Sequence, residues 1–262
     1  MLKKEIEKDG ILRITLCDVD NKNALSYLMM KKIKNIINES NNNDSIKVIV
    51  IAAEGNVFCS GHNLKEISSA RSNDDNGKSF FEELFNECSS LMQELVNCNK
   101  PIIAEINGVA TAAGCQLVAS CDLAISSDNS RFATPGVNIG LFCSTPMVAL
   151  SRNVSKKDAM MMLLTGDMID ASEAKRISLI NDHVPEEELR KFVMELAKNL
   201  TKKSSTTIEL GKKAFYKQLD LNLANAYKYT SEVMVKNALQ DDAVEGIDAF
   251  IEKREPNWKK NE

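Results

Sequence analysis

Two turns rich in small residues draw attention in this sequence, because each follows a strand-like apolar run and leads into a predicted helix. The first lies in "NVFCSGHNLKEI", after "IKVIVIAAEG", and the second lies in "NGVATAAGCQL", after "PIIAEI". The first backbone N–H groups of a helix have no intrahelical partner, and small residues let a ligand approach them closely. Each turn alone is either a simple strand–helix junction or a site for an anion or a carbonyl oxygen. Two such turns facing each other would form an oxyanion hole.

Residue identity argues against several other kinds of site. The sequence contains no GxGxxG dinucleotide fingerprint, no GxxxxGK[ST] phosphate loop and no GxSxG nucleophile elbow. It has two histidines, His62 and His183, and seven cysteines without a CxxC pair, so we predict reduced thiols and no metal site. The net charge of −4 favours no nucleic-acid partner. No apolar run approaches the roughly 20 residues that a membrane span needs.

The first ten residues, "MLKKEIEKDG", contain three acidic residues and no hydrophobic stretch. A secretory signal needs an apolar segment, and an organellar transit peptide is poor in acidic residues. We therefore predict a cytoplasmic location, with the mitochondrial matrix reached only if the protein is imported by another route.

Apolar patterns predict alternating strands and helices through most of the chain. Residues 79–96 carry apolar side chains at helical spacing, and Pro185 opens another helix that is followed only by helical patterns. Four apolar runs are predicted strands: residues 11–16, 46–53, 101–106 and 121–127. This order predicts an α/β fold in which residues 1–190 form the core and residues 191–262 form a helical C-terminal region.

Five segments resemble the crotonase (enoyl-CoA hydratase/isomerase) superfamily and occur in the order found there. "VFCSGHNLKE" is similar to its oxyanion segment, and the stretch from "PIIAEINGV" to "FATPGVNIGL" is similar to its long second motif. The other three are "NKNALS", "LLTGDMIDASEAKRISLI" and "GIDAFIEKREPNW". The resemblance covers essentially the whole chain. It implies a crotonase (ClpP-like) fold of repeated ββα units whose C-terminal helices build a homotrimer or a dimer of trimers.

The resemblance also implies a ligand and the residues that bind it. The ligand is an acyl-CoA thioester, so coenzyme A is part of the substrate and no separate cofactor is expected. The thioester oxygen would accept hydrogen bonds from the N–H groups of His62 and Ala113. Phe250 and Lys253 would approach the CoA of a neighbouring subunit, where a cation meets phosphate. Four residues would line the CoA and thioester channel: His62, Asn63, Leu64 and Lys65.

The sequence departs from the family at the two glutamates that handle the protons of water in its hydratases. Gln116 and Gly136 occupy these two positions. An amide is not a general base and glycine has no side chain, so ordinary hydration and double-bond isomerisation are both in doubt. Glu105, Asp122 and Asp128 are the nearby carboxylates that could substitute, but Glu105 lies within a predicted strand and is expected to be paired.

Three functions stay open on these residues. The first is a hydratase/isomerase family protein of acyl-CoA or fatty-acid metabolism with weak or altered catalysis. The second is an acyl-CoA enzyme of another type, such as a methylmalonyl-CoA decarboxylase. Those enzymes resemble this chain in having a histidine at the position after Gly61 and in the "VNIG" run. The resemblance implies that the His62 ring would contact a substrate carboxylate. The third is a non-catalytic acyl-CoA-binding protein. For Cys143 to act as a nucleophile, a neighbouring base or positive charge would have to favour its thiolate form.

Overall fold

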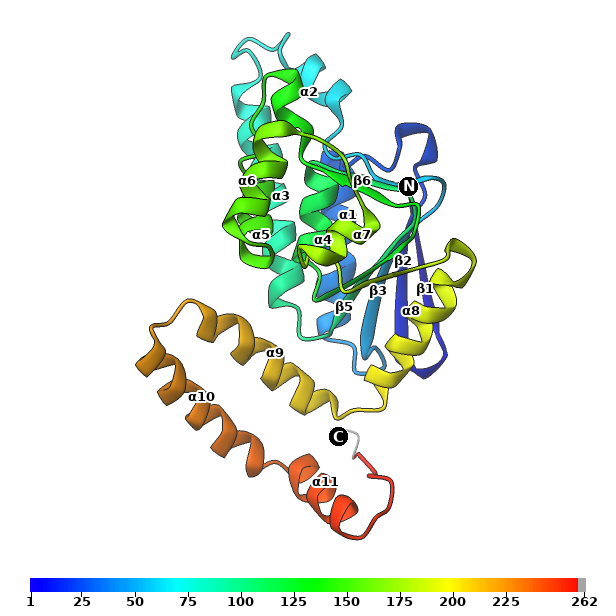
Figure 1. Ribbon diagram of the computed structural model, residues 1–262, viewed down its shortest axis with the longest axis vertical. Helices are drawn as coiled ribbons and strands as arrows, with labels where there is room; N and C mark the ends of the chain where they lie inside the picture. The colour runs from blue at the N-terminus through cyan, green and yellow to red at the C-terminus, as the bar shows by residue number, and fades with distance from the viewer. Residues whose placement is uncertain (259–262) are drawn as a thin grey trace.

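Six strands form the larger of two sheets in the computed structural model, which describes residues 1–258 (Figure 1). β1 pairs antiparallel with β2, and the other neighbouring strands of this sheet are parallel. The apolar runs of β2, β3 and β5 are buried on both faces, as expected for parallel strands covered by helices. In spatial order the strands are β1 (Leu2–Glu7), β2 (Ile11–Leu16), β3 (Val48–Ala53), β5 (Ile102–Ile106), β7 (Leu123–Ser127) and β10 (Asp182–Val184).

The smaller sheet is built from short strands that follow strands of the larger sheet along the chain. β4 follows β3, β6 follows β5 and β8 follows β7, and helical turns follow each pair. β4, β6 and β8 are parallel to one another, and β9 closes the sheet antiparallel to β8. This repetition of strand, strand and helix confirms the predicted crotonase fold. In spatial order the strands are β4 (Val57–Cys59), β6 (Val109–Thr111), β8 (Arg131–Ala133) and β9 (Ile169–Asp170).

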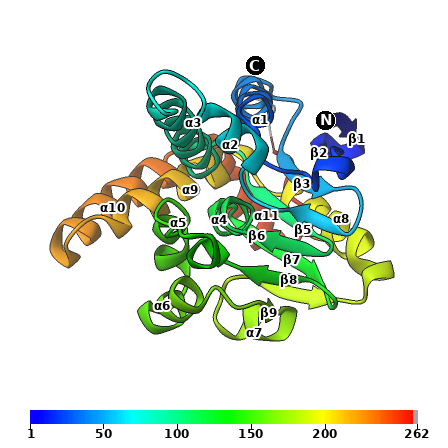
Figure 2. The ribbon, with the colours of Figure 1, turned by 90° about the horizontal axis from the view of Figure 1, so that it is seen from above.

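Helices cover both faces of the larger sheet (Figure 2). α1 (Tyr27–Asn41), α3 (Lys78–Asn97) and α4 (Ala113–Ser120) contribute to the main hydrophobic core on one face. α8 (Glu186–Thr201) covers the other face, where Val193 lies in a second cluster with residues of β2, β3 and β5. The remaining elements of this part are α2 (Leu64–Ala70), α5 (Pro146–Asn153), α6 (Lys156–Thr165), α7 (Ala171–Arg176) and the 3₁₀ helices η1 (Lys8–Gly10), η2 (Val19–Asn21) and η3 (Pro135–Ile139).

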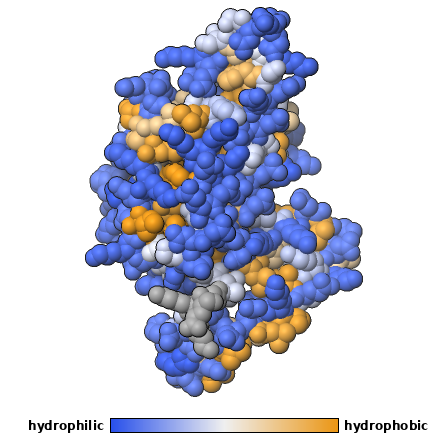
Figure 3. All heavy atoms as spheres, turned by 180° about the vertical axis from the view of Figure 1, so that it is seen from behind, coloured by the Kyte–Doolittle hydropathy of each residue, from blue (hydrophilic) through white to orange (hydrophobic). Residues whose placement is uncertain are grey.

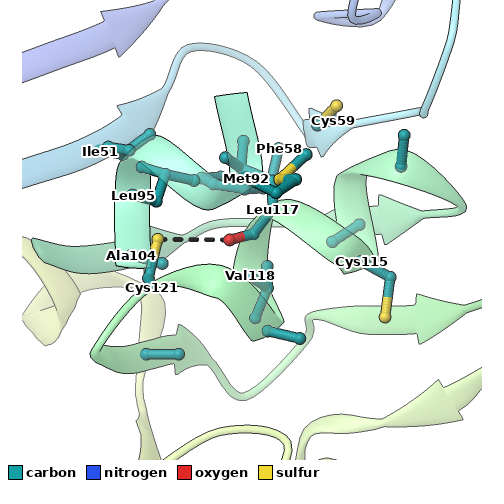
Figure 4. Packing of buried hydrophobic residues seen from close by; sticks show 14 of the residues in the cluster. Ile51, Phe58, Cys59, Met92, Leu95, Ala104, Cys115, Leu117, Val118 and Cys121 are labelled. Carbon is teal, nitrogen blue, oxygen red and sulfur yellow. Dashed lines mark hydrogen bonds between the residues drawn. The ribbon is translucent and has the colours of Figure 1, made fainter. Parts of the chain in front are cut away.

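α4 lies inside the main core, and all of its residues are buried (Figure 4). Leu117 belongs to the same cluster as Phe58 and Met92, and the Cys121 thiol donates a hydrogen bond to the Leu117 carbonyl at 3.3 Å. The sequence "AGCQLVAS" suits this place because its small residues let the helix approach its neighbours closely. The first turn of α4 is therefore held in a fixed position.

The chain leaves the core after α8 and forms an arm of three helices (Figure 1). The predicted boundary between residues 190 and 191 falls inside α8, whose buried face packs on the sheet. The last four residues of the predicted C-terminal region, 259–262, lie outside the described part. The arm consists of α9 (Ser205–Leu219), α10 (Leu223–Ala238) and α11 (Asp241–Ile251). Figure 3 shows hydrophobic residues gathered on it, and its exposed apolar side chains include Phe215, Leu219, Leu223, Tyr227, Met234, Val235, Leu239, Ile247 and Phe250.

A partly buried polar cluster attaches the arm to the core. The Lys212 ammonium of α9 donates to Asp122 Oδ2 at 2.6 Å and to the carbonyl oxygens of Leu95 and Lys100 at 3.1 and 3.0 Å. The Tyr216 hydroxyl donates to Asp122 Oδ1 at 2.9 Å, and burial together with the Asp122 charge raises the pKa of Tyr216. Asp122 follows α4 by two residues, so the same carboxylate joins the end of the core helix to the arm.

Glu105 does not replace the missing glutamates, because it is paired inside the sheet. Its two carboxylate oxygens accept hydrogen bonds from the Arg13 guanidinium at 2.7 and 2.6 Å, and both side chains are buried. Burial lowers the pKa of Arg13, but the hydrogen bonds to Glu105 and the charge of Glu105 together outweigh it, so the pKa of Arg13 is raised. The expectation that Glu105 is paired is therefore correct.

Replacing Glu105 by Ala is expected to lower the free energy of unfolding by about 3 kcal/mol, because the Arg13 charge is left buried without its partner. The double replacement Arg13→Met with Glu105→Leu should recover most of this loss, since an apolar pair has no charge to desolvate. Urea unfolding of the single and double variants measures both effects. A double variant as unstable as Glu105→Ala would contradict this account.

Candidate active site

The two turns predicted from the sequence lie against each other in the structure. β4 and β6, which lead into them, are parallel neighbours. Gly61 has φ +93°, and a Cβ placed on it would lie 2.9 Å from Ala112 Cβ, 3.1 Å from the Thr111 carbonyl and 3.3 Å from the Ala113 nitrogen. The Thr111 hydroxyl also donates to the Ser60 carbonyl at 3.1 Å. The structure therefore brings the residue before His62 to the Ala113 amide, as the oxyanion-hole hypothesis requires.

The Ala113 amide is the first of α4, where a helix offers N–H groups without intrahelical acceptors. Ala112, immediately before it, has φ 51° and ψ −118°, and such a conformation costs a non-glycine residue of the order of 1–3 kcal/mol. The Ala112 amide donates to the Ala133 carbonyl of β8 at 2.9 Å, which holds this strained turn in place. Strain of this kind accumulates at binding sites, where the backbone must direct an N–H group at a ligand.

The His62 ring folds inward rather than toward solvent. Its Nδ1 lies 3.3 Å from the Leu25 carbonyl oxygen. A carbonyl oxygen only accepts hydrogen bonds, so Nδ1 carries the proton and Nε2 of the neutral ring is an acceptor. Nε2 is buried and has no hydrogen-bond partner within residues 1–258. The ring packs edge-to-face against Phe85, with centroids 5.6 Å apart and an interplanar angle of 76°.

Burial lowers the pKa of His62, and the bond to Leu25 offsets this only in part. The unfolded residue keeps an ordinary pKa of 6.5, so below about pH 6.5 the unfolded chain binds more protons than the folded one. The free energy of unfolding should therefore fall as the pH drops from about 7 to about 5. His62→Gln should remove the part of this pH dependence that comes from His62. His183→Gln should keep that part unchanged. Equal slopes for His62→Gln and the unchanged protein, in urea titrations at several pH values, would refute this assignment.

Neither family glutamate position offers a base. Gln116 lies one turn into α4, is only 4% exposed, and its Oε1 accepts a weak hydrogen bond from the Cys88 thiol at 3.6 Å. Gly136 lies in η3, and a Cβ added there would be 2.6 Å from the Leu141 carbonyl and 2.9 Å from Cys143 Sγ. The room that a side chain at position 136 would need is thus already filled. Burial raises the pKa of the Cys143 thiol, which disfavours its use as a nucleophile.

The other residues implied by the resemblance fall into two groups. Asn63 caps α2, with its side chain accepting from the Lys65 amide at 3.0 Å, and Leu64 and Lys65 follow as exposed residues next to His62. Phe250 lies in the last turn of α11 and Lys253 lies two residues beyond this helix, which is at the opposite end of the molecule from α2 (Figure 1). One chain alone therefore does not place them beside His62. Their contact with the CoA of a neighbouring subunit stays a prediction.

Two features near the site were not predicted from the sequence. Thr134 is 1% exposed, and its hydroxyl has no hydrogen-bond partner among the described residues. It follows Ala133, which pairs with Thr111, so it lies beside the strained Ala112. Phe85, which contacts the His62 ring, also lines a hollow of about 560 Å³. The residues that line it are Asp75, Asn76, Lys78, Phe81, Glu82, Phe85 and Asn86. The one sequence signal that could have placed Thr134 near the site is that it precedes Gly136, a family glutamate position, by two residues.

Thr134→Val is expected to raise the free energy of unfolding by about 1 kcal/mol in the absence of ligand. Valine has nearly the same shape as threonine, and the substitution removes a buried hydroxyl that lacks a partner. Thermal unfolding of the two proteins measures the difference. A clear destabilisation would show that the hydroxyl is satisfied in solution.

Within residues 1–258, no three His, Cys, Asp or Glu side chains are grouped so that they could bind a metal ion. None of the helices in this part of the chain is both long and apolar enough to span a bilayer.

Comparison with known proteins identifies the family. The sequence profile of the enoyl-CoA hydratase/isomerase family matches residues 6–261. The mouse mitochondrial protein named enoyl-CoA hydratase domain-containing protein 3 is 49% identical over 252 residues, which cover 96% of this chain and 82% of that protein. The 2,3-dehydroadipyl-CoA hydratase of Escherichia coli K12 is 28% identical, with 95% of each chain covered.

Solved structures agree with this result. The crystal structure of human enoyl-CoA hydratase domain-containing protein 3 has a TM-score of 0.93 and 46% identity, with 98% of this chain and 99% of that chain covered. An enoyl-CoA hydratase from Mycobacterium smegmatis has a TM-score of 0.94 and 38% identity, with 98% of each chain covered. The resemblance read from the five segments is confirmed, and the chain belongs to the enoyl-CoA hydratase/isomerase family.

Proposed function

We propose that this chain binds acyl-CoA thioesters, with the thioester oxygen held between the N–H groups of His62 and Ala113. The observation that carries the proposal is the backbone contact between the two turns, in which the Gly61 Cβ position is 3.3 Å from the Ala113 nitrogen. Two main-chain donors that converge in this way stabilise a carbonyl oxygen and, more strongly, the oxyanion that forms from it. Coenzyme A enters as part of the ligand, and no separate cofactor is needed.

The chemistry of the site differs from that of a hydratase. Adding water across a double bond requires one group to take a proton from water and another to deliver a proton to carbon. Gln116 and Gly136 can do neither, and Glu105 is paired with Arg13. We therefore propose a family member of acyl-CoA metabolism in which binding and oxyanion stabilisation persist and ordinary hydration does not.

The arm supports a proposal about assembly. Its exposed apolar side chains, such as Leu223, Leu239 and Phe250, need a cover that residues 1–258 of the same chain do not provide. We propose that the arms build a homotrimer or a dimer of trimers, in which Phe250 and Lys253 of one subunit meet the CoA of the next. Light scattering should then report a multiple of 29.0 kDa, and a 29.0 kDa particle at micromolar concentration would refute the proposal.

Two cellular locations are candidates. The relatives named above include proteins described as mitochondrial, whereas the first ten residues favour the cytoplasm. Fractionation of cells that express the protein decides between the two compartments.

The test of the proposed function removes the oxygen from the ligand rather than the donor from the protein. Calorimetry should compare butyryl-CoA with S-butyl-CoA, a thioether of almost the same shape that lacks the carbonyl oxygen. We expect the thioether to bind about tenfold more weakly, which corresponds to the loss of about one good hydrogen bond. Equal affinities for butyryl-CoA and S-butyl-CoA would contradict the proposed oxyanion hole. Mass spectrometry of products from a panel of acyl-CoAs, incubated with the protein, then shows whether any reaction follows.

A further inference from the structure

Three side chains outside the candidate active site form a chain of hydrogen bonds. The Ser172 hydroxyl lies 3.5 Å from Nε2 of His183, and Nδ1 of the same ring is hydrogen-bonded to the Asp128 carboxylate. Ser172 follows β9, which lies at the edge of the smaller sheet opposite β4. The width of that sheet therefore separates this cluster from the turn that contains His62.

The main chain holds His183 and Asp128 next to each other. Their strands, β10 and β7, are parallel neighbours, and the Asp128 amide donates to the Val184 carbonyl at 2.9 Å. Asp182 accepts hydrogen bonds from the His183 amide at 2.9 Å and from the Lys175 ammonium at 2.6 Å. Lys175 belongs to α7, so the same contacts position the helix that carries the serine.

The hydrogen bonds fix the tautomer of the neutral His183 ring. A carboxylate only accepts hydrogen bonds, so Asp128 keeps the proton on Nδ1 and the lone pair on Nε2 faces the Ser172 hydroxyl. A serine becomes a nucleophile when a neighbouring base takes its proton and a third group orients that base. Catalytic hydrogen bonds are often long before substrate binds, so a separation of 3.5 Å is compatible with this role.

We propose that Ser172 and His183 form a hydrolytic site for carboxylic esters, with Asp128 as a positioning residue. Ser172 Oγ attacks the carbonyl carbon of the ester while its proton moves to His183 Nε2. The bond to the leaving alcohol then breaks, and the alcohol departs with that proton. Water attacks the acyl-serine in the same way, its proton passes through Nε2 to Ser172 Oγ, and the carboxylic acid is released. Asp128 stabilises the imidazolium that forms in both steps.

The exposure of the three side chains defines the class of ester. Ser172 is exposed, so an ester reaches its hydroxyl directly from solvent. The side chains of Asp128 and His183 are 53% and 26% exposed, so water screens their charges more strongly than in a buried site. Stabilisation of the transition state is then modest, which favours substrates whose leaving group departs easily. Small aryl esters, which release a phenol, meet this requirement.

Hydrolysis of p-nitrophenyl acetate by the whole chain tests the proposal. Ser172→Ala and His183→Gln should each lower kcat/KM at least about tenfold, because a serine without its base is a weak nucleophile. Ser151→Ala is the matched control, since Ser151 is also an exposed helical serine but its hydroxyl donates to the Val148 carbonyl at 3.5 Å. The control should hydrolyse the ester at an unchanged rate. A Ser172→Ala protein as active as the control would overturn the proposal.

Two further comparisons separate a catalytic role from a structural one. Because Ser172 and His183 act as a unit, the double variant should be no slower than either single variant. Losses that multiply in the double variant would overturn the proposal. Asp128→Asn should lower kcat with KM unchanged, and Asp128→Glu should recover part of the rate. A kcat that Asp128→Asn does not change would remove Asp128 from the site.

Covalent labelling tests the nucleophile without relying on turnover. A fluorophosphonate reacts with an activated serine by forming a P–O bond and releasing fluoride, while the base takes the serine proton. Peptide mass spectrometry should find the label on Ser172, and the His183→Gln protein should be labelled at least about tenfold more slowly. A label absent from Ser172, or equally fast in His183→Gln, would overturn the proposal. None of these measurements requires acyl-CoA binding, so they stand apart from the proposed function.

Discussion

Hydration of crotonyl-CoA by this chain is expected to be at least about 10⁴-fold slower than hydration by a family member that carries both glutamates. Each proton-transfer group is taken at the lower end of its usual contribution, about 10²-fold. The physical reason is that the buried amide of Gln116 cannot exchange protons with water and that Gly136 has no side chain. A steady-state assay of purified protein at saturating substrate measures the rate. Ordinary turnover, with contaminating hydratase excluded by mass spectrometry, would contradict the expectation.

Restoring the two carboxylates is not expected to restore the activity. Gln116→Glu places a carboxylate in a position that is 4% exposed, where burial favours its protonated form. Gly136→Glu meets the Leu141 carbonyl, because even its Cβ would lie 2.6 Å from that oxygen. The double variant should therefore unfold at a lower temperature and stay a poor hydratase. Turnover near that of a competent hydratase would show that the Leu141 segment can move aside.

The replacement Gly114→Ala is expected to have the largest effect on folding, with a loss of more than about 4 kcal/mol. The new Cβ would lie 2.2 Å from the Cys59 carbonyl oxygen and 2.8 Å from its carbon, and neither backbone atom can rotate away. Relief of the overlap requires β4 and α4 to separate. That separation would also part the two turns, so any folded fraction should lose its affinity for butyryl-CoA.

Gly211→Ala is the matched control, because Gly211 is also a helical glycine without positive φ. A Cβ on Gly211 meets no atom within 4 Å. The substitution should raise stability by about 1 kcal/mol, the usual gain from Gly to Ala inside an exposed helix. Thermal unfolding and calorimetry with butyryl-CoA distinguish the two variants. A Gly114→Ala protein with unchanged melting temperature and affinity would remove the argument from close backbone packing.

Local patterns predicted the features that depend on neighbouring residues. The apolar runs at 46–53 and 101–106 located β3 and β5, and the small residues around Gly61 and Ala113 located both turns. Their convergence could not follow from periodicity alone, since it depends on the parallel pairing of β4 with β6. The ordered motifs of the family supplied that link. The position of α8 could not be predicted for the same reason. Its apolar face was visible in the sequence, but the contact of that face with the larger sheet was not.

The side-chain environments at the site could not be predicted from the sequence. The orientation of the His62 ring depends on the Leu25 carbonyl, 37 residues away. The sequence places a glycine at position 136 but does not show what occupies the space beside it. Gly136 has no positive φ, and the obstacle to a side chain there is the Leu141 carbonyl. The first fact is a contact between distant segments, and the second is the way the chain after η3 folds back onto Gly136, where the Leu141 amide donates to the Gly136 carbonyl at 2.9 Å. Residue types alone specify neither.

The backbone contact between the two turns has a consequence for a saturation mutagenesis scan. The donor at position 62 is a main-chain amide, so the residue type there should vary widely without loss of binding to unsubstituted acyl-CoAs. Gly61 and Gly114 supply no donor in the proposed hole, yet a single methyl group at either meets neighbouring backbone or Cβ atoms at 2.9 Å or less. The scan should therefore show intolerance at the residues beside the donors and tolerance at His62. A search for essential side chains would find the neighbours of this site and miss the His62 donor itself.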